Sequence, residues 1–189
     1  MLVNMTDYLH QILPPERAAK LTEISSLETI RSGSHFISQG DVPRKVAFVV
    51  SGLFRYVYIT ENGDEYTKSL IQQGSFISSY SAMITESPSH FYIQALEDAE
   101  VLKTPYLKLK ALLDTDPFWV KFLLKFVEKG FITKEKRERD LLLLDAETRY
   151  LNFLAEFPGL GNRVKQNIIA SYLGIKPESL SRIRKKLQS

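Results

Sequence analysis

The sequence predicts an α+β protein: a domain of short antiparallel strands, then a long helix, then a small helical domain. Three observations predict this fold class. Residues 34–104 contain short runs of β-branched and aromatic residues between turn-forming glycine, asparagine and aspartate. Residues 118–144 form an intermittently apolar helical segment, and a short basic helix ends the chain. A length of 189 residues suits one medium domain with a small second one.

A helix is predicted in the first 30 residues, and short strands follow it. Pro14-Pro15 precede ERAAKLTEI, whose apolar residues recur at helical spacing. Five strand-like runs come next: KVAFVV, LFRYVYI, EYTKSLI, HFYIQAL and AEVLKT. Between the second and the third, Asn62-Gly63 predicts a hairpin, because both residues accept a positive φ. Strands at a spacing of roughly ten residues indicate a β-sandwich or barrel.

Pro105 ends the strand region, and two helices are expected after it. The segment YLKLKALLDTD is a short helix that stops before Pro117. The helix over 118–144 carries an apolar stripe and then a charged stretch, TKEKRERD. It is longer than one small core needs, so we expect it to pack on a second copy of the chain. The dimerisation residues are Phe118, Phe122, Leu123 and Phe126. The alternative is an intramolecular helix whose charged middle lies in solvent.

Composition excludes several classes of function. The chain has no cysteine, so it can form no disulfide, no Cys-ligated iron–sulfur cluster and no Cys-ligated zinc site. It shows neither a signal peptide nor about 18 consecutive apolar residues, and we expect a soluble, cytoplasmic protein without membrane contact. The three histidines are scattered, at 10, 35 and 90, and neither a P-loop nor a GxSxG elbow occurs. We therefore expect no enzyme, no cupin-type metal site and no haem.

Charge is divided unevenly between the two parts of the chain. Residues 1–120 carry 10 Lys/Arg against 14 Asp/Glu, whereas residues 121–189 carry 15 against 8. Within 163–189 there are seven basic residues and a single acidic one, Glu178. An acidic N-terminal part followed by a basic C-terminal part indicates an appended module that binds a polyanion.

The ending QNIIASYLGIKPESLSRIRKKLQS predicts a helix-turn-helix. Ala170 is small, as two closely packed helices require, and Gly174 stands where the chain turns with a positive φ. In the second helix Leu180, Ile183 and Leu187 are expected to point inward. The alternative is an ordinary helical hairpin with a solvated basic face.

The opposite face of this last helix carries side chains that suit double-stranded DNA. Arg182 can pair with a guanine edge, Glu178 can accept from cytosine N4, and Lys185 suits a phosphate. The predicted DNA-binding residues are Lys176, Glu178, Ser179, Ser181, Arg182, Lys185 and Lys186.

Together with the glycine turns at Gly33, Gly40, Gly52 and Gly74, these segments resemble the Crp–Fnr family of bacterial transcription regulators. The ending is similar to the family's helix-turn-helix. The stretch GSHFISQGDVPRKVAFVVSGLFRYVYITENGDEYTKSLIQQGSFI is similar to its cyclic-nucleotide-binding-type β-roll, and LLLLDAETRYLNFL to the link that joins the dimerisation helix to the DNA-binding domain.

The resemblance implies a domain order and partners. It implies a jelly-roll-like antiparallel double-stranded β-helix as the sensor domain over 1–117, a dimerisation helix over 118–144 and a helix-turn-helix domain over 145–189. It also implies a homodimer that presents two reading helices to successive major grooves of a near-palindromic site, with RNA polymerase as a further partner.

The sensor departs from the cAMP-binding members at the two positions that hold the nucleotide. The family's glutamate, which binds the ribose 2′-hydroxyl, falls on Ser79, and its phosphate-neutralising arginine falls on Ser89 or His90. No Lys or Arg occurs between Lys68 and Lys103. A charge-assisted hydrogen bond is worth roughly 1.5–3 kcal/mol against about 1 kcal/mol for a neutral one. We therefore expect no cAMP binding and no cofactor.

A hydroxyl-rich cassette stands in place of those ligands. The candidate pocket residues are Gly74, Ser75, Ser78, Ser79, Tyr80, Ser81, Ser89 and His90. They either hold another small-molecule effector, neutral or of different shape, or only satisfy a collapsed loop.

A second departure lies after the reading helix. Only Gln188 and Ser189 follow it, so we expect the family's C-terminal wing to be lacking and fewer phosphate contacts to form. Two functions remain from the sequence. One is a dimeric, sequence-specific transcription regulator with a degenerate effector pocket, and the other is a non-enzymatic dimeric scaffold with a weakened DNA reader.

Overall fold

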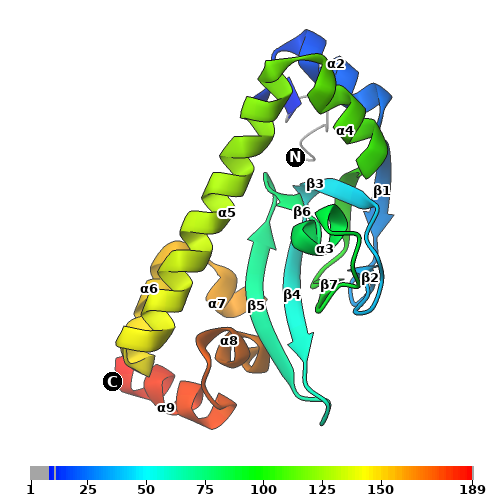
Figure 1. The fold of residues 1–189 in the computed structure, drawn as a ribbon. Coiled ribbons are helices and arrows are strands. Elements are labelled where there is room, and N and C mark those ends of the chain that lie inside the picture. Colours follow the sequence, from blue (N-terminus) through cyan, green and yellow to red (C-terminus); the bar gives the residue numbers. More distant parts are fainter. Residues whose placement is uncertain (1–8, 11, 189) are drawn as a thin grey trace. The chain divides into compact units, whose positions relative to one another are not determined.

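The computed structural model describes residues 9–10 and 12–188, and it has the α+β architecture that the sequence predicts (Figure 1). The strands are β1 (Ser26–Ile30), β2 (His35–Ile37), β3 (Lys45–Ser51), β4 (Leu53–Ile59), β5 (Glu65–Gln72), β6 (Phe76–Ile77), β7 (Tyr92–Ala95) and β8 (Ala99–Pro105). The helices are α2 (Pro15–Glu23), α3 (Tyr80–Ile84), α4 (Tyr106–Thr115), α5 (Pro117–Leu143), α6 (Ala146–Glu156), α7 (Leu160–Arg163), α8 (Gln166–Leu173) and α9 (Pro177–Gln188).

The strands form two four-stranded sheets, ordered β1-β8-β3-β6 and β2-β7-β4-β5. The strand pairs β1–β8, β3–β8, β3–β6 and β2–β7 are antiparallel. Strands of both sheets contribute to one buried apolar cluster, and this shared core explains the run of β-branched and aromatic residues in the sequence. Its members are Phe36, Ile37, Ala47, Val49, Phe54, Ile77, Phe91, Ile93, Ala95, Ala99 and Val101.

Turn residues shape the sheets where the sequence predicts turns. Gly63 has φ +85°, and the Thr60 N–H donates to the Asp64 carbonyl at 3.0 Å, which confirms the hairpin between β4 and β5. Gly52 has φ +102°, and a Cβ built there would lie 2.4 Å from the Ala99 Cβ. Only glycine fits at this position, because both the backbone and the space exclude a side chain.

Contacts divide the chain into two compact units. The first consists of the chain up to Tyr56 and of Ile71–Leu124, and the second of Val57–Leu70 and the chain from Lys125 onward. The predicted domain limits stay predictions, and their outermost residues, 1 and 189, lie outside the described residues. The outer part of the β4–β5 hairpin groups with the helical end of the chain.

The helical end has a small core of its own. Buried apolar residues come from each of its four short helices: Tyr150, Phe153, Leu160, Ile168, Ile169, Ala170, Tyr172, Leu173 and Leu180. Phe153 packs on Tyr172, with ring centroids 5.7 Å apart. Along the part of the chain that the structure describes, no helix is long and apolar enough to cross a membrane.

Candidate functional site

The turn between α8 and α9 has the geometry that the sequence predicts. Gly174 follows α8 with φ +67°. Its N–H donates to the Ser171 carbonyl at 3.2 Å, and the Ile175 N–H donates to the Ala170 carbonyl at 3.0 Å. These bonds satisfy the last carbonyls of α8 and redirect the chain. A Cβ on residue 174 would lie 3.1 Å from Leu141 Cδ2, so the turn is also tightly packed.

The inward face of α9 is only partly as predicted. Leu180 is fully buried and Ile183 is half-buried, but Leu187 is 43% exposed, so its inward assignment is wrong. Arg184 occupies this face in its place. Its Nε donates to the Tyr150 hydroxyl and its Nη2 to the Gly161 carbonyl, each at 3.0 Å. Arg184 therefore anchors α9 to the neighbouring helices and is not available to a ligand.

The outward face of α9 presents a row of three charged residues, Glu178, Arg182 and Lys185, here called the reading row. They are spaced i, i+4 and i+7, and all three are exposed. Arg182 Nη2 donates to Ser179 Oγ at 3.0 Å, which holds the guanidinium along the helix.

The other predicted DNA-binding residues differ in their exposure. Lys176 is exposed just before α9, whereas Ser179 and Ser181 are half-buried. Lys186 is exposed but forms an ion pair with Glu147 on α6, with Nζ 2.6 Å from Oε2. This hydrogen bond to Glu147 raises the pKa of Lys186 above its usual range. A phosphate would compete with a carboxylate for this ammonium group.

In the other candidate site, the cassette after β5, the backbone is fastened to strand β3. Gly74 has φ +82°, and its N–H donates to the Val49 carbonyl at 2.9 Å. The Val49 N–H donates in turn to the Ser75 carbonyl at 2.9 Å. The glycine turn thus holds the start of the cassette in place.

The positions that would hold a ribose and a phosphate are joined to each other. Ser79 and Ser89 are 1% and 2% exposed, and their hydroxyl oxygens lie 2.9 Å apart. Ser89 Oγ also lies 2.7 Å from the Phe91 carbonyl oxygen. With Ser89 donating to the Phe91 carbonyl and Ser79 donating to Ser89, both hydroxyl protons are engaged within the chain.

Ser78 is likewise bonded internally. Its Oγ donates to the Lys45 carbonyl at 2.9 Å, and its N–H donates to the Tyr56 hydroxyl at 3.2 Å. Burial raises the pKa of Tyr56 far above its usual range, so the phenol stays neutral. Tyr80, Ser81 and His90 are exposed instead. The structure thus joins Ser79 to Ser89, engages Ser78 with Lys45 and Tyr56, and leaves the other three exposed.

Helix α5 has an aromatic face and an apolar exposed face. Phe122 packs edge-on against Phe76 of its own chain at a centroid distance of 6.1 Å, and Phe118 packs on Trp119 at 5.4 Å. The Arg17 guanidinium lies 4.8 Å from the centroid of the Phe118 ring. Two of the four predicted dimerisation residues therefore already have partners within the protomer.

The exposed face of α5 carries a different set of apolar residues, here called the outer row. Val120, Leu124, Val127 and Phe131 are 51%, 48%, 39% and 65% exposed. Their spacing of four, three and four residues is the spacing of a coiled-coil seam. The sequence stripe identified the aromatic face of the helix, and the exposed face became visible only in the structure.

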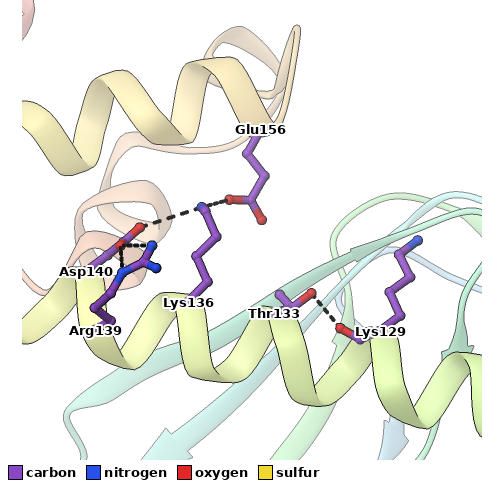
Figure 2. A network of polar contacts seen from close by, with 6 residues as sticks. All are labelled: Lys129, Thr133, Lys136, Arg139, Asp140 and Glu156. Carbon is purple, nitrogen blue, oxygen red and sulfur yellow. Dashed lines mark hydrogen bonds and ion pairs between the residues drawn. The ribbon is translucent and has the colours of Figure 1, made fainter.

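A polar network connects α5 to α6 (Figure 2). Lys136 Nζ lies 2.5 Å from Glu156 Oε2 and 3.6 Å from Asp140 Oδ2, and Arg139 Nη2 lies 3.0 Å from Asp140 Oδ1. The bond to Glu156 raises the pKa of Lys136. Since Glu156 belongs to the last turn of α6, this contact helps to fix the angle between the two helices. Charged residues 20 positions apart gave no sequence signal for it.

Known proteins share both a domain and the fold. Residues 27–116 match the family profile of the cyclic nucleotide-binding domain. Electron transport regulator A of Shewanella oneidensis is 24% identical over 176 residues, which cover 87% of this chain and 70% of that protein.

Solved structures extend the likeness to nearly the whole chain. FixK2 from Bradyrhizobium japonicum has a TM-score of 0.78 at 17% identity, covering 87% of this chain and 85% of its own. CLP of Xanthomonas campestris, a c-di-GMP responsive global regulator, has a TM-score of 0.76 at 17% identity, with coverage of 90% and 89%. A regulator assigned to the Crp/Fnr family from Eubacterium rectale has a TM-score of 0.73 at 16% identity, with coverage of 98% and 88%. Over most of its length the chain thus has the fold of these regulators, as the resemblance implies.

Proposed function

We propose that this protein is a dimeric transcription regulator that reads double-stranded DNA with helix α9. The observation that carries the proposal is the reading row. Glu178, Arg182 and Lys185 line the exposed face of the second helix of a helix-turn-helix, while Leu180 and Arg184 hold the opposite face to the core. A helix held in this way can enter a major groove and present its row to base edges.

Within this row the roles follow from chemistry. The Arg182 guanidinium offers paired donors, which match guanine O6 and N7, and Glu178 can accept from cytosine N4. Lys185 and Lys176 are exposed ammonium groups that suit phosphates, and they fix the position of the helix along the backbone. Lys186 contributes less, because Glu147 already binds its ammonium group.

The dimer contact is assigned to the outer row of α5. A second copy of the same helix would cover Val120, Leu124, Val127 and Phe131, which are otherwise exposed. The aromatic face with Phe122 serves the core of the protomer instead. A two-fold pair of helices would give two reading rows related by symmetry, as a near-palindromic site requires.

The effector pocket is proposed not to bind cAMP. The support is the hydrogen bond between Ser79 and Ser89, together with the lack of any Lys or Arg between Lys68 and Lys103. A phosphate monoanion placed there would find no cation within the cassette and would have to break a buried hydroxyl pair. We further propose that the protein is not an enzyme and uses no cofactor. Binding of a small neutral effector in this pocket is the alternative.

The proposal is tested by selecting binding sites from a random pool of duplex DNA and by measuring affinity for the selected site. Arg182→Ala is expected to cost about 1–3 kcal/mol and to relax one base position. Lys129→Ala, which removes an exposed positive charge from α5, is the control and should leave affinity and selectivity unchanged. If no sequence is selected, or if Arg182→Ala binds like the wild type, the assignment of α9 as the reader is wrong. Weak binding to all sequences would favour the alternative function, a non-enzymatic dimeric scaffold with a weakened DNA reader.

A further inference from the structure

Strand β5 lies at the edge of its sheet, and helix α8 covers part of that edge. In the order β2-β7-β4-β5 only one side of β5 has a strand neighbour. On the other side the Thr67 N–H donates to Ser171 Oγ at 2.8 Å, and Ser171 Oγ donates to the Glu65 carbonyl at 3.0 Å. Glu65 and Thr67 are two residues apart, so their outward backbone groups point the same way. One hydroxyl therefore satisfies two groups of an otherwise open strand edge.

A third element closes the same contact. Arg137 of α5 donates from Nη2 to the Thr67 carbonyl at 3.0 Å. Its guanidinium also lies 4.2 Å from the centroid of the Tyr172 ring, next to Ser171 on α8. Thr67 is 1% exposed, so water cannot replace these bonds while the contact is closed. All of these residues belong to the second compact unit.

The helix that makes this contact is half of the helix-turn-helix. On α8 the residues beside Ser171 are buried in the core, and Ser171 alone of its last four residues is half-exposed. The contact therefore involves the outward side of α8. The reading row of α9 stays exposed while the contact is closed.

We propose that Ser171 and Arg137 form a clamp that holds the helix-turn-helix to strand β5 and thereby fixes the orientation of the reading helix before DNA is bound. This inference rests on the proposed DNA-binding function. Because the reading row is exposed in the clamped arrangement, the clamp pre-orients the reader and does not block it. Strand β5 continues from the clamp to Gln72, two residues before Gly74, so the clamp also ties the reader to the strand that leads into the cassette.

A pre-oriented pair of readers has a distinct signature in binding. The two reading helices of a dimer must both match a full palindromic site at once. If their orientation is no longer fixed, full-site binding carries an additional entropic cost of ordering them. A half-site binds one reading helix, so its affinity does not depend on the orientation of the other. The clamp therefore contributes to full-site affinity only.

The test compares Ser171→Ala and Arg137→Met with two control variants in the full chain. Asn167→Ala removes an exposed polar side chain from the same helix, and Thr67→Val removes a buried hydroxyl that has no partner while keeping the backbone bonds. Amide hydrogen exchange of Thr67 reports directly on the clamp. DNA affinity is measured with the selected full site and with its half-site.

Ser171→Ala is expected to speed Thr67 amide exchange by about tenfold and to weaken full-site binding by about three- to tenfold, with half-site binding unchanged. Arg137→Met should weaken full-site binding in the same direction, and both controls should behave like the wild type. The clamp is overturned if Thr67 stays protected in Ser171→Ala, or if protection is lost and full-site affinity is unchanged or higher. A wild type that selects no DNA sequence contradicts the proposed function instead, and Thr67 exchange still decides whether the clamp exists.

Discussion

The hydroxyl cassette and the reading row are both polar, but the cassette buries its two central serines, whereas the reading row is exposed to solvent. Ser79 and Ser89 are buried and bonded to each other at 2.9 Å, whereas Arg182 and Lys185 are exposed. A buried pair whose hydroxyl protons are both engaged has no donor to offer until one of its own bonds is broken. Exposed cations can meet a polyanion without that loss. The comparison teaches that polar composition alone does not make a site: the direction of the side chain decides.

The same distinction separates the two faces of α5. Phe122 is packed against Phe76 of its own chain, and Phe131 is 65% exposed. Both are phenylalanines on one helix, yet the first is half-buried by its own chain, whereas the second leaves most of its surface for another molecule. Four substitutions test which of these residues are engaged within the chain, from the largest expected effect to the smallest.

Phe131→Asp should separate the proposed dimer. Placing two carboxylates in an apolar seam leaves them unpaired, which should weaken dimerisation by about 100-fold or more. Full-site DNA affinity should fall with it. Analytical ultracentrifugation over a concentration series measures the dissociation constant.

Ile132→Asp is the matched control, because Ile132 is also 65% exposed but lies off the outer row. It should remain dimeric, and Phe122→Asp should lower stability because it disrupts the core of the protomer. Equal dimerisation of Phe131→Asp and the wild type would contradict the assignment of the outer row.

Ser89→Ala should destabilise the protein by about 1–3 kcal/mol, because it leaves the Ser79 hydroxyl and the Phe91 carbonyl without this buried partner. Ser81→Ala, at an exposed position of the same cassette, should change stability by less than about 0.5 kcal/mol. Urea unfolding gives both values. A neutral Ser89→Ala would mean that the hydroxyl pair is not a structural contact.

Glu147→Gln should make one more cation available to DNA. Removing the carboxylate that binds Lys186 should raise affinity for all sequences by about two- to threefold and steepen the salt dependence by up to about 0.9 in slope for each protomer. Titrations at several salt concentrations measure this slope. An unchanged slope would show that Lys186 does not reach a phosphate even without its carboxylate partner.

Asp145→Asn should reduce the loss of unfolding free energy that the protein undergoes as the pH falls into the acid range. Asp145 caps α6 by accepting the Thr148 N–H at 2.8 Å, and this bond lowers the pKa of the carboxyl. Its charged form therefore contributes stability that is complete above the unfolded pKa of about 3.9 and is lost as the pH falls through the folded pKa. Asparagine also caps a helix but carries no charge. The urea midpoints of the wild type and of Asp145→Asn should converge as the pH is lowered from 5 to 3. Midpoints that fall in parallel would contradict this.

Much of the fold was readable from local sequence. The alternating strands, the Asn62-Gly63 hairpin, the long helix and the Gly174 turn follow from residues that are neighbours in the chain, and the structure confirms them. The inward position of Leu187 was predicted wrongly, because helical spacing alone could not show that Arg184 takes this face through Tyr150 and Gly161.

The contacts that need distant segments could not be predicted. Thr67 and Ser171 are 104 positions apart, and a threonine in a strand and a serine in a helix are both common. Likewise, the spacing of apolar residues on α5 marks two stripes, and only tertiary packing decides which one is exposed. Local patterns specify elements, whereas their pairing depends on the fold.

The most direct test of the account is one anisotropy titration of the wild type with a selected palindromic duplex and a scrambled one, each with and without saturating cAMP. We predict tight binding to the selected duplex, weak binding to the scrambled one and no effect of cAMP on either. Equal binding to both duplexes would contradict the reading row. Selective binding that appears only with cAMP would contradict the closed hydroxyl cassette.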